Sequence, residues 1–186
     1  MTKNPELIMD EKALNETLEK LAEEIINDLG GKDNFALIGI RTRGVTLAQR
    51  MQKIVKQKVK REPLLGTLDI TLYRDDLSTL AKHPLVRPTT LPFDVDGTKI
   101  VLVDDVLYTG RTIRAALDQI ADFGRPAVAR LAVLIDRGLR EYPIQPDYTG
   151  RKIETNPDQL IQVRLKEIDG DEKVVLLKLK NRQEGH

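Results

Sequence analysis

The chain has 186 residues, of which 40% are hydrophobic and 32% charged, and its formal net charge is +1. This length predicts one domain with a sizeable core, and the balanced charge predicts no general affinity for polyanions, so a nucleic-acid partner would need a local basic patch. The absence of cysteine excludes disulfides, thiolate zinc sites and cysteine nucleophiles, and the presence of only two histidines argues against a histidine-built metal site or a Ser-His-Asp hydrolase.

The first half of the chain predicts alternating helices and strands. Asp10 is a candidate cap for a first helix that Gly30 and Gly31 would end. The apolar face of this helix consists of Leu14, Leu18, Leu21, Ala22, Ile25, Ile26 and Leu29. The elements expected next are a strand over 35–40, a helix through about residue 56, a strand over 64–73 and a long polar connection over 74–92. Connections of that length inside one domain are usually functional.

The second half of the chain predicts two further buried strands and a different C-terminal pattern. Buried strands are expected over 100–103 and 127–135, with a helix between them that ends near Phe123. Alternating apolar residues from Ile161 to Leu179 then predict an antiparallel hairpin that turns at Asp169 and Gly170. The fold class is therefore α/β, with a central, mainly parallel sheet flanked by helices and a C-terminal β-hairpin addition.

The most informative stretch places two acids and a phosphate loop directly after a buried strand. Asp104 and Asp105 follow the four apolar residues 100–103, at the strand end where open α/β sheets bind ligands. Residues 106–112 bring three hydroxyls and the flexible Gly110 to the start of a helix, whose free N–H groups and dipole suit a phosphate. Carboxylates accept hydrogen bonds from vicinal hydroxyls or from water on a cation. The combination predicts a site for a ribose 5-phosphate.

This stretch resembles the signature by which type I phosphoribosyltransferases bind 5-phosphoribosyl-1-pyrophosphate (PRPP). Flanking blocks narrow the resemblance to the PyrR family of pyrimidine operon attenuators that are also uracil phosphoribosyltransferases. These blocks are residues 37–44, 68–77 and 134–138, followed by 146–148. The resemblance implies one phosphoribosyltransferase domain over 1–186, with a core over about 10–140 and a hood over about 141–180.

The resemblance also implies a role for each block. Asp104, Asp105 and Arg74 would be catalytic, and the last of these would lie in a mobile flap that excludes water. The ribose and 5′-phosphate of PRPP would be bound by Asp104, Asp105, Val106, Leu107, Tyr108, Thr109, Gly110, Arg111 and Thr112. Pyrophosphate would be bound by Arg41, Thr42, Arg43 and Gly44, and the base by Asp136 and Arg137. Mg²⁺ would be held mainly by PRPP and water, with Asp104 and Asp105 as candidate ligands.

RNA attenuation is the second function that the resemblance implies. A candidate RNA face consists of Lys53, Lys56, Arg140, Arg151 and Lys152. The chain departs from the family pattern at this face, because Leu139 and Gln145 stand where a histidine and an arginine are usual, and Glu19 and Glu23 add negative charge. A regulator that binds pyrimidine leader RNA with little catalysis therefore stays an alternative, as does a purine phosphoribosyltransferase.

The expected partners are PRPP, uracil, UMP and a pyrimidine operon leader RNA, and the family resemblance suggests a homodimer or homotetramer. No apolar run approaches membrane-spanning length, and the first residues lack the apolar core of a signal peptide, so the cytoplasm is the expected location.

Overall fold

Five parallel strands form the central sheet of the protein, in the order β3-β2-β4-β5-β6. The structure is a computed structural model that describes residues 5–30, 34–71 and 88–179. The strands of this sheet are β2 (Phe35–Ile40), β3 (Leu64–Leu68), β4 (Lys99–Leu107), β5 (Val128–Asp136) and β6 (Tyr148–Lys152). All six residues of β2 are buried, as expected for a strand covered on both faces.

The strand order reverses between β2 and β4, which predicts a crevice at the carboxyl edge of the sheet. β2 pairs in parallel with β3 on one side and with β4 on the other. The chain therefore winds outward from β2 to β3 and then returns to place β4 on the opposite side. Ligands of open α/β sheets bind at such a reversal, beyond the carboxyl ends of the strands.

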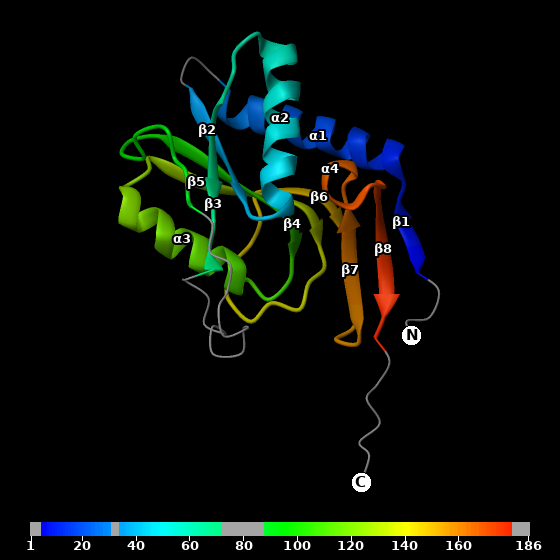
Figure 1. Cartoon of the computed structure of the whole chain (residues 1–186). Coiled ribbons are helices and arrows are strands. Elements are labelled where there is room, and N and C mark those ends of the chain that lie inside the picture. Colours follow the sequence, from blue (N-terminus) through cyan, green and yellow to red (C-terminus); the bar gives the residue numbers. More distant parts are fainter. Residues whose placement is uncertain (1–4, 31–33, 72–87, 180–186) are drawn as a thin grey trace.

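Helices cover both faces of this sheet (Figure 1). α1 (Glu11–Leu29) and α2 (Arg43–Val59) pack together on one face, and α3 (Arg111–Phe123) covers the other. The predicted cap of α1 is confirmed, because the Ala13 N–H donates to Asp10 Oδ1 at 2.8 Å. α2 continues past the predicted residue 56 to Val59, and Lys60 then adopts a left-handed conformation with φ of 56°. Within the described residues, none of the helices is long and apolar enough to cross a membrane.

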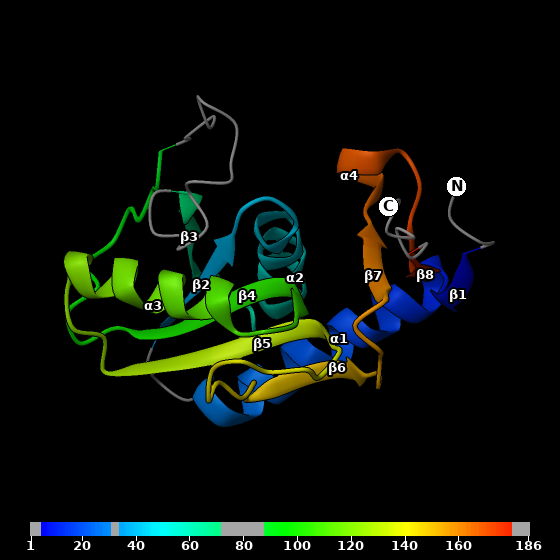
Figure 2. The same ribbon diagram turned by 90° about the horizontal axis from the view of Figure 1, so that it is seen from below.

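A second, three-stranded antiparallel sheet stands beside the first and forms the hood (Figure 2). Its order is β1 (Glu6–Met9), β8 (Lys173–Lys178), β7 (Gln159–Arg164). The predicted antiparallel pairing of β7 with β8 is confirmed. The connection between them contains a one-turn helix, α4 (Lys166–Asp169), where a simple turn was expected.

The two sheets do not simply follow the order of the chain. β1, from the amino-terminal end of the chain, belongs to the hood sheet, whereas β6 pairs in parallel with β5 in the core sheet. β3 is also shorter than the predicted strand over 64–73. It ends at Leu68 because the Asp69 side chain turns the backbone, accepting hydrogen bonds from Thr71 N at 2.9 Å and from Thr71 Oγ1 at 2.5 Å.

Candidate active site

The two predicted carboxylates lie inside β4, two and three residues before its last residue. The strand was expected to end at Val103, but it continues to Leu107, because Val106 and Leu107 still pair with Ile135 and Asp136 of β5. Asp104 is 7% exposed, and its Oδ1 accepts a hydrogen bond from the Asp105 N–H at 2.9 Å. The pair is therefore held rigidly at the carboxyl edge of the sheet.

Burial raises the pKa of both carboxyl groups. Desolvation is the main cause at Asp104, and the charge of Asp105 raises its pKa further, well above the ordinary value. Desolvation also raises the pKa of Asp105, while the Asp104 hydrogen bond and the charge of Arg43 act in the opposite direction. Two desolvated acids side by side require hydrogen-bond donors or a cation to stabilise their charge. Ribose hydroxyls and Mg²⁺ are ligands of that kind.

The predicted phosphate loop narrows to a turn over 108–110 that leads into α3. Gly110 is the N-cap residue of α3, with φ of 91° and no side-chain cap, so the first N–H groups of the helix depend on other acceptors. Thr109 Oγ1 accepts only a long hydrogen bond of 3.3 Å from Arg111 N. The first N–H groups and the dipole of α3 make this turn suitable for an anion.

The arginine loop over 41–44 lies beside the carboxyl pair. A Cβ on Gly44 would come within 2.3 Å of Val103 O and 3.3 Å of Asp104 Cα, so only glycine allows α2 to begin this close to β4. The Nε atoms of Arg41 and Arg43 are buried, and neither has a hydrogen-bond acceptor within the part of the chain that the structure describes. Buried polar groups normally have partners, so these two guanidinium groups are suited to an anionic ligand.

Asp136 and Arg137, the predicted base-pocket residues, are buried at the end of β5 and already have protein partners. Asp136 Oδ1 accepts hydrogen bonds from Gly138 N at 3.0 Å and from Arg140 Nη2 at 2.6 Å. Arg137 donates to Thr155 Oγ1 at 3.0 Å and to Gln159 O at 2.8 Å. Its guanidinium carbon also lies 4.1 Å from the centre of the Tyr108 ring. Arg137 therefore fixes the connection to the hood and orients the half-exposed Tyr108.

The candidate RNA face is only partly exposed. Lys53, Arg151 and Lys152 are exposed, and Lys56 is exposed but paired with Glu62 at 2.5 Å. The Arg140 side chain is 15% exposed, and its guanidinium holds the 138–144 loop through Ile144 O and Tyr108 O, so its part in an RNA contact stays a prediction. The sequence could not reveal this, since those contacts form only in the folded loop.

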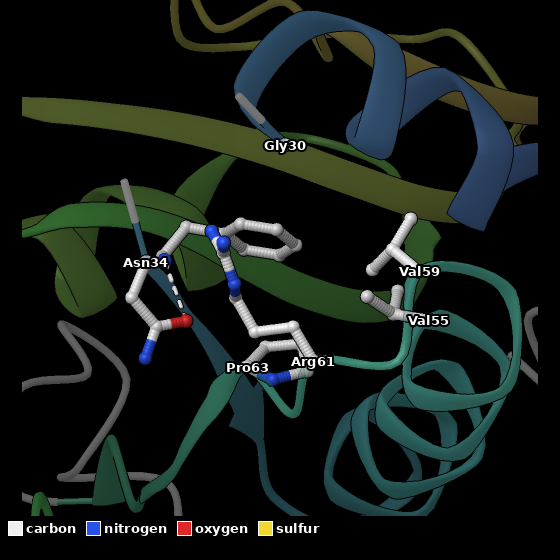
Figure 3. A pocket seen from close by; sticks show the side chains of 7 residues that line it. Gly30, Asn34, Val55, Val59, Arg61 and Pro63 are labelled. Carbon is white, nitrogen blue, oxygen red and sulfur yellow. Dashed lines mark hydrogen bonds between the residues drawn. The ribbon is translucent and has the colours of Figure 1, made fainter. Parts of the chain in front are cut away.

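One predicted site residue lies outside the described residues, and one cavity lies away from the carboxyl pair. Arg74, the predicted flap residue, lies outside the described residues. A cavity of about 90 Å³ is lined by seven residues. Asn34, Val55, Arg61 and Pro63 are among them (Figure 3). These residues lie at the amino-terminal ends of β2 and β3 and the end of α2, so this cavity is at the opposite edge of the sheet from the carboxyl pair.

Sequence reasoning missed one residue that contacts the arginine loop. Asp169, at the end of α4, accepts a hydrogen bond from Arg43 Nη2 at 2.8 Å. The sequence showed Asp169 only as a turn residue before glycine, and no pattern in it indicates a contact across 126 positions.

The residues present fit a magnesium ion bound together with its substrate. Between residues 5–30, 34–71 and 88–179, no group of three His, Cys, Asp or Glu side chains is arranged to hold a metal. Asp104 and Asp105 supply two carboxylates, and Mg²⁺ commonly takes one or two carboxylates and completes its shell with water and phosphate oxygens.

Comparison with known proteins decides the family. Residues 6–168 match the phosphoribosyl transferase domain. The Bifunctional protein PyrR of Pelotomaculum thermopropionicum is 52% identical over 177 residues, which cover 95% of this chain and 98% of that protein. The namesake from Elusimicrobium minutum is 48% identical over 171 residues, covering 92% and 96%. The chain belongs to the PyrR family of phosphoribosyltransferases.

Solved structures agree on the fold at much lower sequence identity. A hypoxanthine-guanine phosphoribosyltransferase from Bacillus anthracis has a TM-score of 0.71 with 19% identity, covering 94% of this chain and 98% of its own. The hypoxanthine phosphoribosyltransferase of Trypanosoma cruzi has a TM-score of 0.72 with 16% identity, covering 94% and 97%. These likenesses confirm the type I phosphoribosyltransferase fold.

Proposed function

We propose that this protein transfers the 5-phosphoribosyl group of PRPP to uracil, giving UMP and pyrophosphate. The observation that carries the proposal is the adjacent pair of the buried Asp104 and the partly buried Asp105, placed between the amide-rich turn before α3 and the arginine loop over 41–44. A ribose with a phosphate on one side and a pyrophosphate on the other matches that order of groups. Membership of the PyrR family supports uracil as the acceptor.

The reaction exchanges one bond at the anomeric carbon for another. The bond from that carbon to the pyrophosphate oxygen breaks, the bond to uracil N1 forms, and the N1 proton is released. By analogy with glycoside hydrolysis, we expect positive charge to develop on the ribose ring in the transition state, so placement and electrostatics matter more than a protein nucleophile. The chain has no cysteine, and this mechanism requires none.

Each element of the site has a proposed part in that step. Asp104 and Asp105 accept hydrogen bonds from the two ribose hydroxyls, and their negative charge stabilises the cationic ring. The turn over 108–110 and the first N–H groups of α3 bind the 5′-phosphate. Arg41 and Arg43, whose Nε atoms have no acceptor within the described part of the chain, bind the pyrophosphate. Mg²⁺, bound with PRPP, would neutralise charge on the leaving group, with Asp104 and Asp105 as its candidate protein ligands.

We place the base against the end of β5. Because the Arg137 guanidinium already donates to the hood connection, we expect Asp136 and Arg137 to shape the pocket by fixing the 138–144 loop and Tyr108. Backbone N–H and C=O groups there would read the alternating edge of uracil.

A direct assay of the acceptor tests the proposal. Uracil, hypoxanthine, guanine and orotate are each supplied with PRPP and Mg²⁺, and nucleotide formation is followed. We expect UMP from uracil and little product from the other three bases. A faster reaction with hypoxanthine or guanine than with uracil would show that the acceptor is a purine base. The fold alone allows this alternative.

RNA binding is the second proposed function, and the word bifunctional in the relatives' names favours it. The exposed Lys53, Arg151 and Lys152 would contact phosphates, whereas Glu23 pairs with Lys58 at 2.7 Å and reduces the positive charge there. Filter binding of a pyrimidine leader RNA with and without UMP tests it. Tight, UMP-enhanced binding supports attenuation, and no binding at low salt leaves the enzymatic function alone. A homodimer or homotetramer would present two or four copies of these basic residues to one RNA.

A further inference from the structure

One carboxylate of the hood is fixed against the arginine loop of the core. Asp169 Oδ1 accepts from Arg43 Nη2 at 2.8 Å, and Asp169 Oδ2 accepts from the Leu165 N–H at 2.9 Å. Both oxygens are thus in use. The Asp169 side chain is 14% exposed and that of Arg43 is 29% exposed, so the pair is largely shielded from water.

A second arginine of α2, Arg50, binds the same corner of the hood through hydrogen bonds to two carboxylates. Arg50 lies seven residues after Arg43, on the same face of the helix. It donates from Nε and Nη2 to both oxygens of Glu167, at 2.9 and 2.6 Å. It also donates from Nη1 and Nη2 to both oxygens of Glu172, at 2.5 and 2.8 Å. Arg50 therefore forms a further connection between α2 and the hood, beside the apolar packing of the two.

Arg43 is different because its guanidinium is only partly used. It donates to Asp169 through Nη2, while its Nε is buried without an acceptor within the described ranges. Its charge also acts on Asp105, whose pKa it lowers against the effect of burial. Arg43 thus pairs with a hood carboxylate and acts electrostatically on the carboxyl pair, and part of its guanidinium has no protein partner within the described residues.

We propose that Asp169 is a positioning residue, which holds the Arg43 guanidinium toward the crevice so that it can bind the pyrophosphate group of PRPP. This inference rests on the proposed function. Without Asp169, Arg43 would lose the acceptor that orients it, and its long side chain would turn toward water. Binding of the ligand would then have to order and desolvate the side chain again.

Neutralising Asp169 also has an effect that would raise the affinity for PRPP. Asp169 carries a negative charge beside a site for an anion, so its neutralisation removes a competitor for Arg43. The two effects change the affinity for PRPP in opposite directions. Because Oδ2 is already held by Leu165 N, the carboxylate is anchored and keeps Arg43 in place, and we expect the loss of orientation to dominate.

The test compares Asp169→Asn with Glu167→Gln. Both substitutions neutralise one carboxylate of α4 that pairs with α2, but only the first touches Arg43. In Asp169→Asn, an amide N–H faces either Leu165 N or Arg43, so one of the two hydrogen bonds is lost. We expect the KM for PRPP, and the Kd for pyrophosphate with Mg²⁺, to rise about tenfold, the effect of one charge-assisted hydrogen bond. We expect kcat to change less than KM.

UMP provides the readout that separates positioning from a loosened hood. UMP carries no pyrophosphate, so its Kd should stay within about twofold of the wild-type value in Asp169→Asn. Glu167→Gln should leave the KM for PRPP and the Kd values for pyrophosphate and UMP within about twofold of the wild-type values. Asp169→Glu, which shifts the carboxylate by one methylene, is the second variant, and its KM for PRPP should rise as well.

Three results would overturn the inference. The first is an unchanged or lower KM for PRPP in Asp169→Asn. The second is a KM for PRPP that rises as much in Glu167→Gln as in Asp169→Asn. The third is a Kd for UMP that rises in Asp169→Asn as much as the KM for PRPP does. Each of these results counts only when the wild-type protein forms UMP in the same assay. A wild-type protein that forms no UMP would instead refute the proposed function.

Discussion

Replacing Asp104 by asparagine should make the unliganded protein more stable and nearly inactive. Asp104 is 7% exposed, and burial together with the charge of Asp105 raises its pKa. The amide oxygen of the substituted side chain can still accept from Asp105 N, so the variant removes a costly charge without losing that hydrogen bond. Optimising such a strained active-site position commonly contributes about 0.5–2 kcal/mol. For a chain of this size, that corresponds to a rise in Tm of roughly 1–8 °C.

The pH dependence gives the sign of this effect. Because the folded pKa of Asp104 lies above its unfolded pKa, the folded wild-type protein binds more protons between these two values, and its stability falls as pH rises through that window. The stability advantage of Asp104→Asn should therefore be largest above the folded pKa and disappear below the unfolded pKa. Thermal unfolding of both proteins across this range measures the difference.

The same variant should lose activity, because an amide provides one acceptor and no charge for the ribose hydroxyls and the cationic ring. We expect kcat/KM for PRPP to fall about 100-fold, equivalent to roughly 3 kcal/mol. Asp118→Asn on the exposed face of α3 is the control, and it should change neither property. A Tm below the wild-type value at neutral pH would refute the claim that the carboxyl pair is strained by burial.

Three further predictions concern the surroundings of the site. Gly44→Ala should lower the stability by about 1–3 kcal/mol and remove activity, because its Cβ would meet Val103 O at 2.3 Å. Thermal unfolding with a UMP assay checks this, and a wild-type Tm would contradict it. Arg137→Ala should cost about 3 kcal/mol through the hydrogen bonds to Thr155 and Gln159, measured by urea unfolding. A loss below about 0.5 kcal/mol, as at an ordinary surface position, would refute that role. Removal of Mg²⁺ with EDTA should stop UMP formation, and excess Mg²⁺ should restore it; full activity in EDTA would exclude the proposed metal.

The elements that sequence predicted best are those with a strong apolar pattern. The strand over 35–40 and the first helix were found in place because their buried residues follow one face or a continuous run. β1 and β6 were missed because neither has such a pattern. Leu7 of β1 is 59% exposed, and Tyr148 is the one buried residue of β6. Both strands exist because a partner strand supplies their hydrogen bonds: β8 at the other end of the chain pairs with β1, and the preceding strand β5 pairs with β6.

The candidate site divides in the same way. Asp104, Asp105 and the turn before α3 are contiguous in sequence, so the strand, the acids and the helix start could be recognised together. The contact of Arg43 with Asp169 and the hydrogen bond of Arg140 to Tyr108 O depend on segments that meet only after folding. Residue type predicts that arginine is exposed. It cannot predict which arginine is held by carbonyl groups of a neighbouring loop.

Binding of nucleotides to the unmodified protein tests the central claim most directly. Titration calorimetry with Mg²⁺ should show uptake of PRPP and UMP, no measurable uptake of uridine, which lacks the phosphate, and loss of UMP binding in Asp104→Asn. If the folded protein takes up neither PRPP nor UMP, residues 104–112 do not bind a ribose 5-phosphate.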